Sequence, residues 1–215
     1  MTPAAAPWRD RIRALRPHPD LVSWIDGLPP ETTYTDAWGA CPRGDWMLWL
    51  VARCEPIRSS AAWSDERKPL VAAAVDCARL ALPTFEARVP KDDRLRRCID
   101  TTSSWSRGEA AREDVEHARS GAYAAAYAAA YAAAYAAASA DDADAAYADA
   151  ASAAFAAFAA DAAAVAAFAA DAAAAAADAY AYAAYASADA AERARVRREC
   201  ADIVRDRFPA PPELP

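Results

Sequence analysis

The sequence feature that most constrains the fold is an alanine tract from residue 122 to residue 190. It holds 46 Ala among 69 residues and contains no Gly, Pro, Lys or Arg. Alanine has the best intrinsic helix propensity because it loses no side-chain entropy, and no proline interrupts the chain from here until Pro209. The tract therefore predicts helix.

One continuous helix would be too long for a compact protein. From residue 113 to residue 208 it would span roughly 140 Å at about 1.5 Å per residue. A folded chain of this length should measure about 45 Å across. The tract is therefore expected to fold back on itself.

The large side chains of the tract predict where it folds back. Four tyrosines at every fourth position, from Tyr123 to Tyr135, centre on one face of a continuous helix. The next four large residues centre on roughly the opposite face, namely Tyr147, Phe155, Phe158 and Val165. We therefore predict antiparallel helices with a break at residues 139–144 and a second break near residues 171–178. The tyrosine stripe is expected to pack under the first-half helices, with a partner-binding role as the alternative.

The first half supplies the larger core side chains, since all 7 Trp lie before residue 106. Apolar spacing predicts helices over residues 7–16, 20–26, 46–53, 68–82 and 95–105, and another that begins near residue 112 and continues through Gly121. Residues 31–39 are expected to form a loop or a short extended piece.

Capping and breaking residues mark the ends of these helices. We expect N-caps at Asp20, Asp45 and either Asp92 or Asp93, with Pro83 and Gly108 as stops. Trp46 and Trp49, three apart on an almost wholly apolar helix, are expected in the core rather than on a ligand-stacking surface.

No segment alternates strongly enough to predict a strand, so the fold class is all-α. The expected architecture is a compact bundle of short Trp-rich helices packed against long Ala-rich antiparallel helices. We predict one domain, in which residues 1–110 supply the Trp-rich part, residues 111–208 supply a hairpin or three-helix layer, and residues 209–215 form a Pro-rich tail.

The net charge of −7 comes from the alanine tract. Residues 1–120 carry 18 basic and 18 acidic side chains, whereas residues 121–191 carry 8 Asp and nothing basic. An acidic surface disfavours nucleic acid, whose phosphates are bound by Lys and Arg, so no nucleic-acid partner is expected. The acidic residues favour either solubility or a basic protein partner.

The five cysteines are odd in number and form no CxxC pair, so we expect reduced thiols rather than disulfides or a zinc site. The N-terminal residues lack the apolar core of a signal peptide. Ala and Tyr also lack the transfer energy of a membrane span. These features predict a cytoplasmic protein that does not cross the membrane.

The sequence contains no phosphate-binding glycine loop, dinucleotide fingerprint or nucleophile elbow. The two histidines, His18 and His117, lie beside prolines and among helix charges, and are expected to be solvated. We therefore predict neither enzymatic activity nor a cofactor or metal.

The acidic cluster of Asp141, Asp142 and Asp144 lies at the expected helix junction. These side chains can cap a helix start, hold a cation or meet an Arg-rich partner. Asp149 projects roughly opposite Tyr147 and should face solvent. We predict these four Asp as the partner-binding residues.

Four blocks of sequence carry a resemblance to a known family. They are CPRGDWMLWL at residues 41–50, RKPLVAAAVDCARLALP at 67–83, WSRGEA at 105–110 and, after the alanine tract, CADIVRDRFP at 200–209. In this order they resemble the number-five-like immunity proteins of bacterial polymorphic-toxin systems, over nearly the whole chain.

The resemblance implies a small cytosolic protein that binds a cognate protein toxin and neutralises it without catalysis. Because toxins that act on nucleic acid carry basic clefts, we expect a basic toxin. The alternative is a structural or scaffold module that associates with other proteins or with further copies of itself.

Overall fold

A computed structural model describes residues 7–88, 90–122, 124–125 and 190–215. These residues are all-helical and contain no strand, which confirms the predicted fold class. Most of the alanine tract lies outside them, so its antiparallel arrangement and its two breaks stay predictions.

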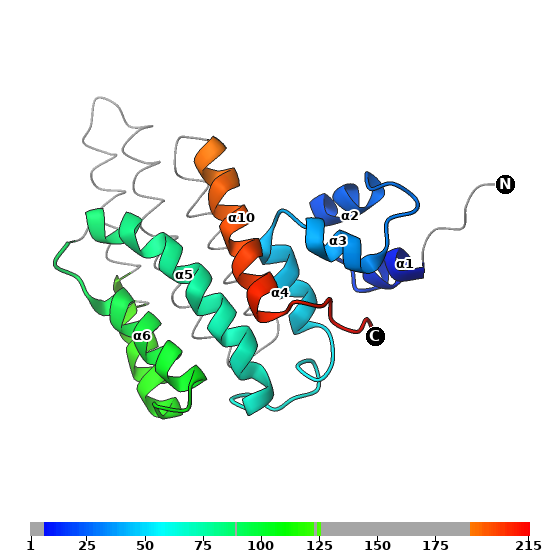
Figure 1. Cartoon of the computed structure of the whole chain (residues 1–215). Coiled ribbons are helices and arrows are strands. Elements are labelled where there is room, and N and C mark those ends of the chain that lie inside the picture. Colours follow the sequence, from blue (N-terminus) through cyan, green and yellow to red (C-terminus); the bar gives the residue numbers. More distant parts are fainter. Residues whose placement is uncertain (1–6, 89, 123, 126–189) are drawn as a thin grey trace.

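The centre of the structure is helix α4 (Gly44–Ala52), which is buried on almost every side. Eight of its nine residues are buried, and Trp49 is half-buried. Its neighbours are α5 (Lys68–Arg88) and α10 (Ala190–Arg207), and α5 packs in turn against α6 (Arg94–Ser106). Figure 1 shows these four helices side by side, with α10 from the far end of the sequence beside α4 and α5.

The predicted core position of Trp46 is confirmed, since only 8% of its surface is exposed. The apolar stripe of α5 also lies in the core, through Leu70, Val71, Ala74, Cys77 and Ala78. The core thus joins the first half of the sequence to α10.

The N-terminal helices α1 (Pro7–Ala14), α2 (Pro19–Asp26) and α3 (Tyr34–Ala40) form the other end of the described structure (Figure 1). Arg9 is 6% exposed and holds this end together. Its guanidinium donates to the carbonyls of Ile25 and Pro29, at 2.7 and 2.6 Å, so it closes the C-terminal end of α2.

Helix α3 corrects the prediction of a loop over residues 31–39. Its start is a capping box, in which the Asp36 N–H donates to Thr33 Oγ1 at 3.1 Å and the Thr33 N–H donates to Asp36 Oδ2 at 3.2 Å. These reciprocal bonds satisfy orphan donors of the first turn. A hydrogen bond from the Thr33 hydroxyl to Asp36 Oδ2 at 2.6 Å, and then the bond from the Thr33 N–H, lower the pKa of Asp36. Local capping and the burial of Ala37 and Trp38 outweigh the weak apolar periodicity of the segment.

Two predicted N-caps are wrong. His18 caps α2 through Nδ1, which accepts from the Asp20 N–H at 3.2 Å, while its ring stays exposed as expected. Asp45 lies inside the first turn of α4, where it is 7% exposed and paired with Arg43. Because a buried carboxylate needs a partner of opposite charge, Asp45 pairs with Arg43 and does not cap the helix.

Helix α5 does not stop at Pro83 but continues to Arg88. A proline removes one helical hydrogen bond, but the ring of Pro83 is exposed here. The turn that follows Pro83 also makes a contact with α6. Glu86, in that turn, accepts from Arg96 Nε of α6 at 2.8 Å. By contrast, α6 lies where the sequence predicts it, and Gly108 closes it at a φ of 81°.

Candidate functional site

The four predicted partner-binding residues, Asp141, Asp142, Asp144 and Asp149, lie outside the described residues. The tyrosine stripe also lies outside them. The structure therefore leaves these predictions as they were and brings forward other surfaces instead.

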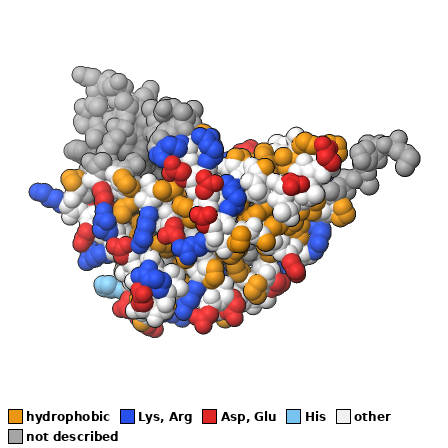
Figure 2. Space-filling model, in the orientation of Figure 1, with side chains coloured by type: hydrophobic (Ala, Val, Ile, Leu, Met, Phe, Trp, Pro, Cys, Tyr) orange, Lys and Arg blue, Asp and Glu red, His pale blue; other side chains and the backbone are white. Residues whose placement is uncertain are grey.

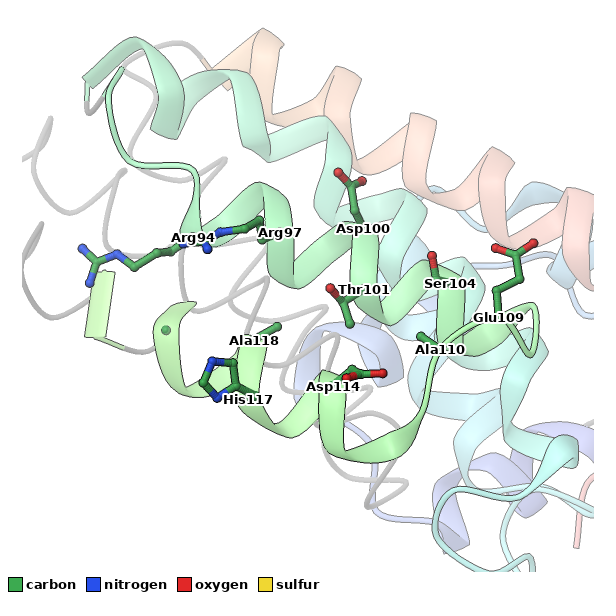
Figure 3. A pocket seen from close by; sticks show the side chains of 11 residues that line it. Arg94, Arg97, Asp100, Thr101, Ser104, Glu109, Ala110, Asp114, His117 and Ala118 are labelled. Atoms are coloured by element: carbon green, nitrogen blue, oxygen red, sulfur yellow. The ribbon is translucent and has the colours of Figure 1, made fainter.

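An open groove of about 590 Å³ runs between α6 and the helix over residues 112–122 (Figure 3). Its two walls are successive helices joined by the Gly108 turn, an arrangement in which a short connection makes the helices neighbours. Eleven residues line it, and they are Arg94, Arg97, Asp100, Thr101, Ser104, Glu109, Ala110, Asp114, His117, Ala118 and Gly121.

Charged groups of this groove are held by neighbours. Asp100 accepts from Arg79 Nη2 of α5 at 2.9 Å, and Arg97 pairs with Asp93 at 3.1 Å. Asp114 accepts from the Ala111 N–H at 3.0 Å and so serves as a cap for the second wall. These side chains already have structural roles.

The remaining two charges, Arg94 and Glu109, form pairs that also shift pKa values. The hydrogen bond from Arg94 lowers the pKa of Asp92, which lies half-buried beside it. The hydrogen bond from Arg107 lowers the pKa of Glu109. Both carboxyls are thereby held ionised, which suits an ion pair and not a proton donor at neutral pH.

The remaining polar residues do not form a catalytic arrangement within the described groove. His117 is exposed, as the sequence predicts, and Figure 3 shows its ring apart from Ser104 along the groove. The Ser104 hydroxyl accepts from Arg107 at 3.2 Å instead. Nucleophilic catalysis needs a base within hydrogen-bond reach of the nucleophile, and no hydrogen bond joins His117 to Ser104 in the part of the chain that the structure describes.

A second groove of about 680 Å³ lies between α5, the end of α6 and α10. Four of its charges form pairs, Asp76 with Arg207 and Lys68 with Asp65, the latter at 2.7 Å. Figure 2 shows basic and acidic side chains alternating over this face, while hydrophobic side chains gather toward the N-terminal helices.

All five cysteines are free and buried, in agreement with the prediction of reduced thiols. Burial raises the pKa of Cys41 and of Cys54 to about 11. A hydrogen bond with Cys200, and then burial, raise the pKa of Cys77. Because the thiolate is the nucleophilic form, these residues are suited to packing rather than to chemistry.

Neither groove was predicted from the sequence. A short connection such as the one through Gly108 places the helices over 95–105 and from 112 next to each other. It did not indicate which residues face the space between them, because Asp100 and Arg97 pair with residues on other turns or helices.

Within the described ranges, no three His, Cys, Asp or Glu residues gather where they could hold a metal ion. The helices of these same ranges also include none with the length and apolarity that a membrane crossing requires. A comparison with protein-family models, with curated proteins and with solved structures found no match to this chain.

Proposed function

We propose that this chain is a non-catalytic cytoplasmic protein that binds a basic protein toxin and neutralises it. The proposal combines the resemblance of its sequence blocks to immunity proteins with the distribution of charge over the structure. The charge distribution is the observation that carries the argument for a basic partner.

The described residues contain all 24 Lys and Arg and 23 of the 31 acidic residues. Their charges are therefore balanced, and many are joined in pairs that link separate helices. Arg79 of α5 binds Asp100 of α6, and Arg207 of α10 binds Asp76 of α5. These groups have partners within the fold.

The 8 remaining acids are Asp residues of segment 126–189, which has no Lys or Arg. No basic side chain in the same segment can pair with these Asp residues. A basic protein partner is the most direct source of such side chains. Complementary charge speeds association and selects against acidic partners. Asp141, Asp142 and Asp144 concentrate this charge, with Asp149 close by in sequence, and are the residues we propose for docking.

The open grooves of the described structure support the same class of function. Small-molecule sites are usually enclosed and apolar, whereas the groove of Figure 3 is open and has charged side chains along its walls. Such polar surfaces are typical of the rim of a protein–protein interface. A protein partner is thus the better fit to its shape and chemistry.

The first test asks whether a gene next to that of this chain encodes a toxin domain, and the second expresses that domain in cells together with this chain. We expect the chain to restore growth and to form a complex with the toxin that survives gel filtration. Growth that stays arrested although both proteins are folded and present would contradict the proposal. Self-association of the chain into arrays, with no complex, would instead support the scaffold alternative.

A further inference from the structure

The C-terminal segment 208–215 reads Phe-Pro-Ala-Pro-Pro-Glu-Leu-Pro and runs from the end of α10 toward α1 and α3 (Figure 1). We call it the tail. Side chains of α1 and α3 bind its main chain at successive points. This contact joins residues up to 204 positions apart in the sequence.

Every hydrogen bond from α1 and α3 to the tail ends on a main-chain oxygen of the tail. Trp38 Nε1 donates to the Phe208 carbonyl at 2.9 Å, and the Tyr34 hydroxyl donates to the Pro212 carbonyl at 3.1 Å. The guanidinium of Arg11 donates to main-chain oxygens of Leu214 and Pro215, at 3.1 Å for the latter.

The donors are held in place by the fold. Tyr34 stacks on Trp8 with 5.7 Å between ring centroids, and the Trp8 indole donates to the Thr32 carbonyl at 3.2 Å. Burial raises the pKa of Tyr34 above its usual value, so its hydroxyl stays protonated and able to donate. Trp38 is 4% exposed within the core.

The tail also packs apolar side chains against the core, with Phe208 partly buried at its start and Leu214 buried near its end. Leu214 is only 7% exposed and belongs to the hydrophobic core cluster, whereas its neighbours Glu213 and Pro215 are exposed. The contact therefore combines main-chain hydrogen bonds with the burial of an apolar side chain.

This combination is the chemistry by which proteins recognise proline-rich segments. Four of the eight tail residues are Pro, which fixes φ near −65° and removes the N–H donor. The chain is thereby biased toward a polyproline II helix, whose carbonyls are free to accept. Aromatic surfaces that carry donors bind such segments because little conformational entropy is lost.

We propose that the face of α1 and α3 formed by Arg11, Tyr34 and Trp38 is a binding site for a proline-rich segment of another protein. The tail occupies this site in the free chain. A partner segment with prolines followed by a leucine takes its place.

The exchange can occur without disturbing the rest of the fold. The contacts of α10 with the core involve Cys200, Ala201 and Val204, all of which precede the tail. Release of the tail gives up its hydrogen bonds, the burial of Leu214 and the packing of Phe208 against the core, and leaves the buried residues of α4, α5 and α10 in contact. The tail acts at an effective concentration in the millimolar range, so it keeps weak competitors out.

The experiment measures how a fluorescent synthetic peptide of the tail sequence binds the full chain, by fluorescence anisotropy. The Leu214→Asp substitution removes the anchor of the attached tail and should free the site. We expect the peptide to bind this variant at least about tenfold more tightly than the wild type. Glu213→Gln, at the exposed neighbouring position, should bind as the wild type does.

Two controls establish that binding occurs at the proposed site. Adding Tyr34→Phe and Arg11→Gln to the Leu214→Asp chain should weaken peptide binding by about tenfold, since Tyr34→Phe removes one hydrogen bond to the tail and Arg11→Gln removes two. A peptide with Asp in place of its Leu should not bind. Equal binding by wild type and Leu214→Asp, or equal binding of both peptides, would overturn the proposal.

A second measurement applies if Leu214→Asp fails to fold by circular dichroism. The native cysteines are all buried, so a dye can be attached selectively to a Glu213→Cys chain. We expect a saturable change in dye emission on addition of the tail peptide and none with the Asp peptide. No change at about 10 mM peptide would overturn the proposal, because that exceeds the effective concentration of the tail.

Light scattering tests whether the tail of a second copy of this chain, rather than a separate partner, occupies the site. A concentration-dependent dimer of the wild type that Tyr34→Phe with Arg11→Gln abolishes would show tails exchanged between two copies. That result would overturn the proposal of a separate partner. A monomer at all concentrations is the expected result.

Discussion

Gly44 lies against the backbone of Cys200 so closely that a β-carbon on Gly44 would be 2.5 Å from the Cys200 carbonyl carbon. This contact joins the first residue of α4 to the middle of α10. Only glycine permits it, because the obstacle is main chain that cannot rotate away. The close approach is one reason why the two ends of the sequence share a core.

Gly44→Ala is therefore expected to destabilise the fold by about 1–3 kcal/mol, the usual cost of overpacking a core. The free energy of unfolding, measured by urea denaturation, tests this. Gly39→Ala is the matched control, since a β-carbon at Gly39 meets nothing within 4 Å, and it should be neutral or slightly stabilising. Equal effects of the two substitutions would refute the close contact.

The capping box of α3 gives a second prediction. Thr33→Ala removes the acceptor for the Asp36 N–H and should cost about 1 kcal/mol in the free energy of unfolding. Thr35→Ala, at an exposed position within the same helix, should change stability little. If both variants melt at the wild-type temperature, the cap contributes nothing.

The Asp92–Arg94 pair predicts a dependence of stability on pH. Because the pKa of Asp92 is lowered in the folded state, its stabilisation is complete above the unfolded value of about 3.9 and is lost as pH falls through the folded pKa. Asp92→Asn should therefore be less stable than wild type at pH 7, and the difference should shrink below about pH 4. A difference in stability that is constant from pH 7 to pH 2 would argue against this pair.

The buried thiols predict low reactivity in the native protein. A thiol reagent at pH 8 should react slowly with the folded chain, because burial raises the pKa of Cys41 and Cys54 to about 11. In denatured protein, without reductant, all five thiols should react rapidly with the reagent. Fewer than five would reveal a disulfide, and rapid reaction of the native chain would reveal an exposed cysteine.

Much of the described fold follows from local sequence patterns. The apolar run of α4 and the Gly108 stop of α6 each predict their helix within a few residues, and the stripe of α5 predicts its start but not its end. α3 was predictable from Thr33 and Asp36, whose spacing is that of a capping box, but its apolar periodicity is weak. The continuation of α5 beyond Pro83 depends on a tertiary ion pair with α6.

The surfaces were less predictable, because they arise from contacts between distant residues. Nothing near Trp38 in the sequence indicates that its indole binds the Phe208 carbonyl, 170 positions away. The groove beside α6 likewise depends on how Asp100 and Arg97 pair after folding. Charge imbalance, by contrast, can be counted from sequence alone, which is why it carries the proposed function.

The central claim is that the unbalanced Asp residues attract a basic toxin, and the association rate constant tests it most directly. Stopped-flow mixing with the toxin domain that this chain neutralises in cells should give an association rate constant that falls with added salt. Asp141→Asn with Asp142→Asn and Asp144→Asn should slow association on the order of threefold or more at low salt, with the fold kept because Asn caps as well as Asp.

The matched control changes the net charge equally at exposed positions elsewhere, through Glu31→Gln, Glu113→Gln and Glu213→Gln. It should associate nearly as fast as the wild type if the Asp cluster is the docking site. An association rate that is unchanged in the triple Asp variant and insensitive to salt would contradict the account.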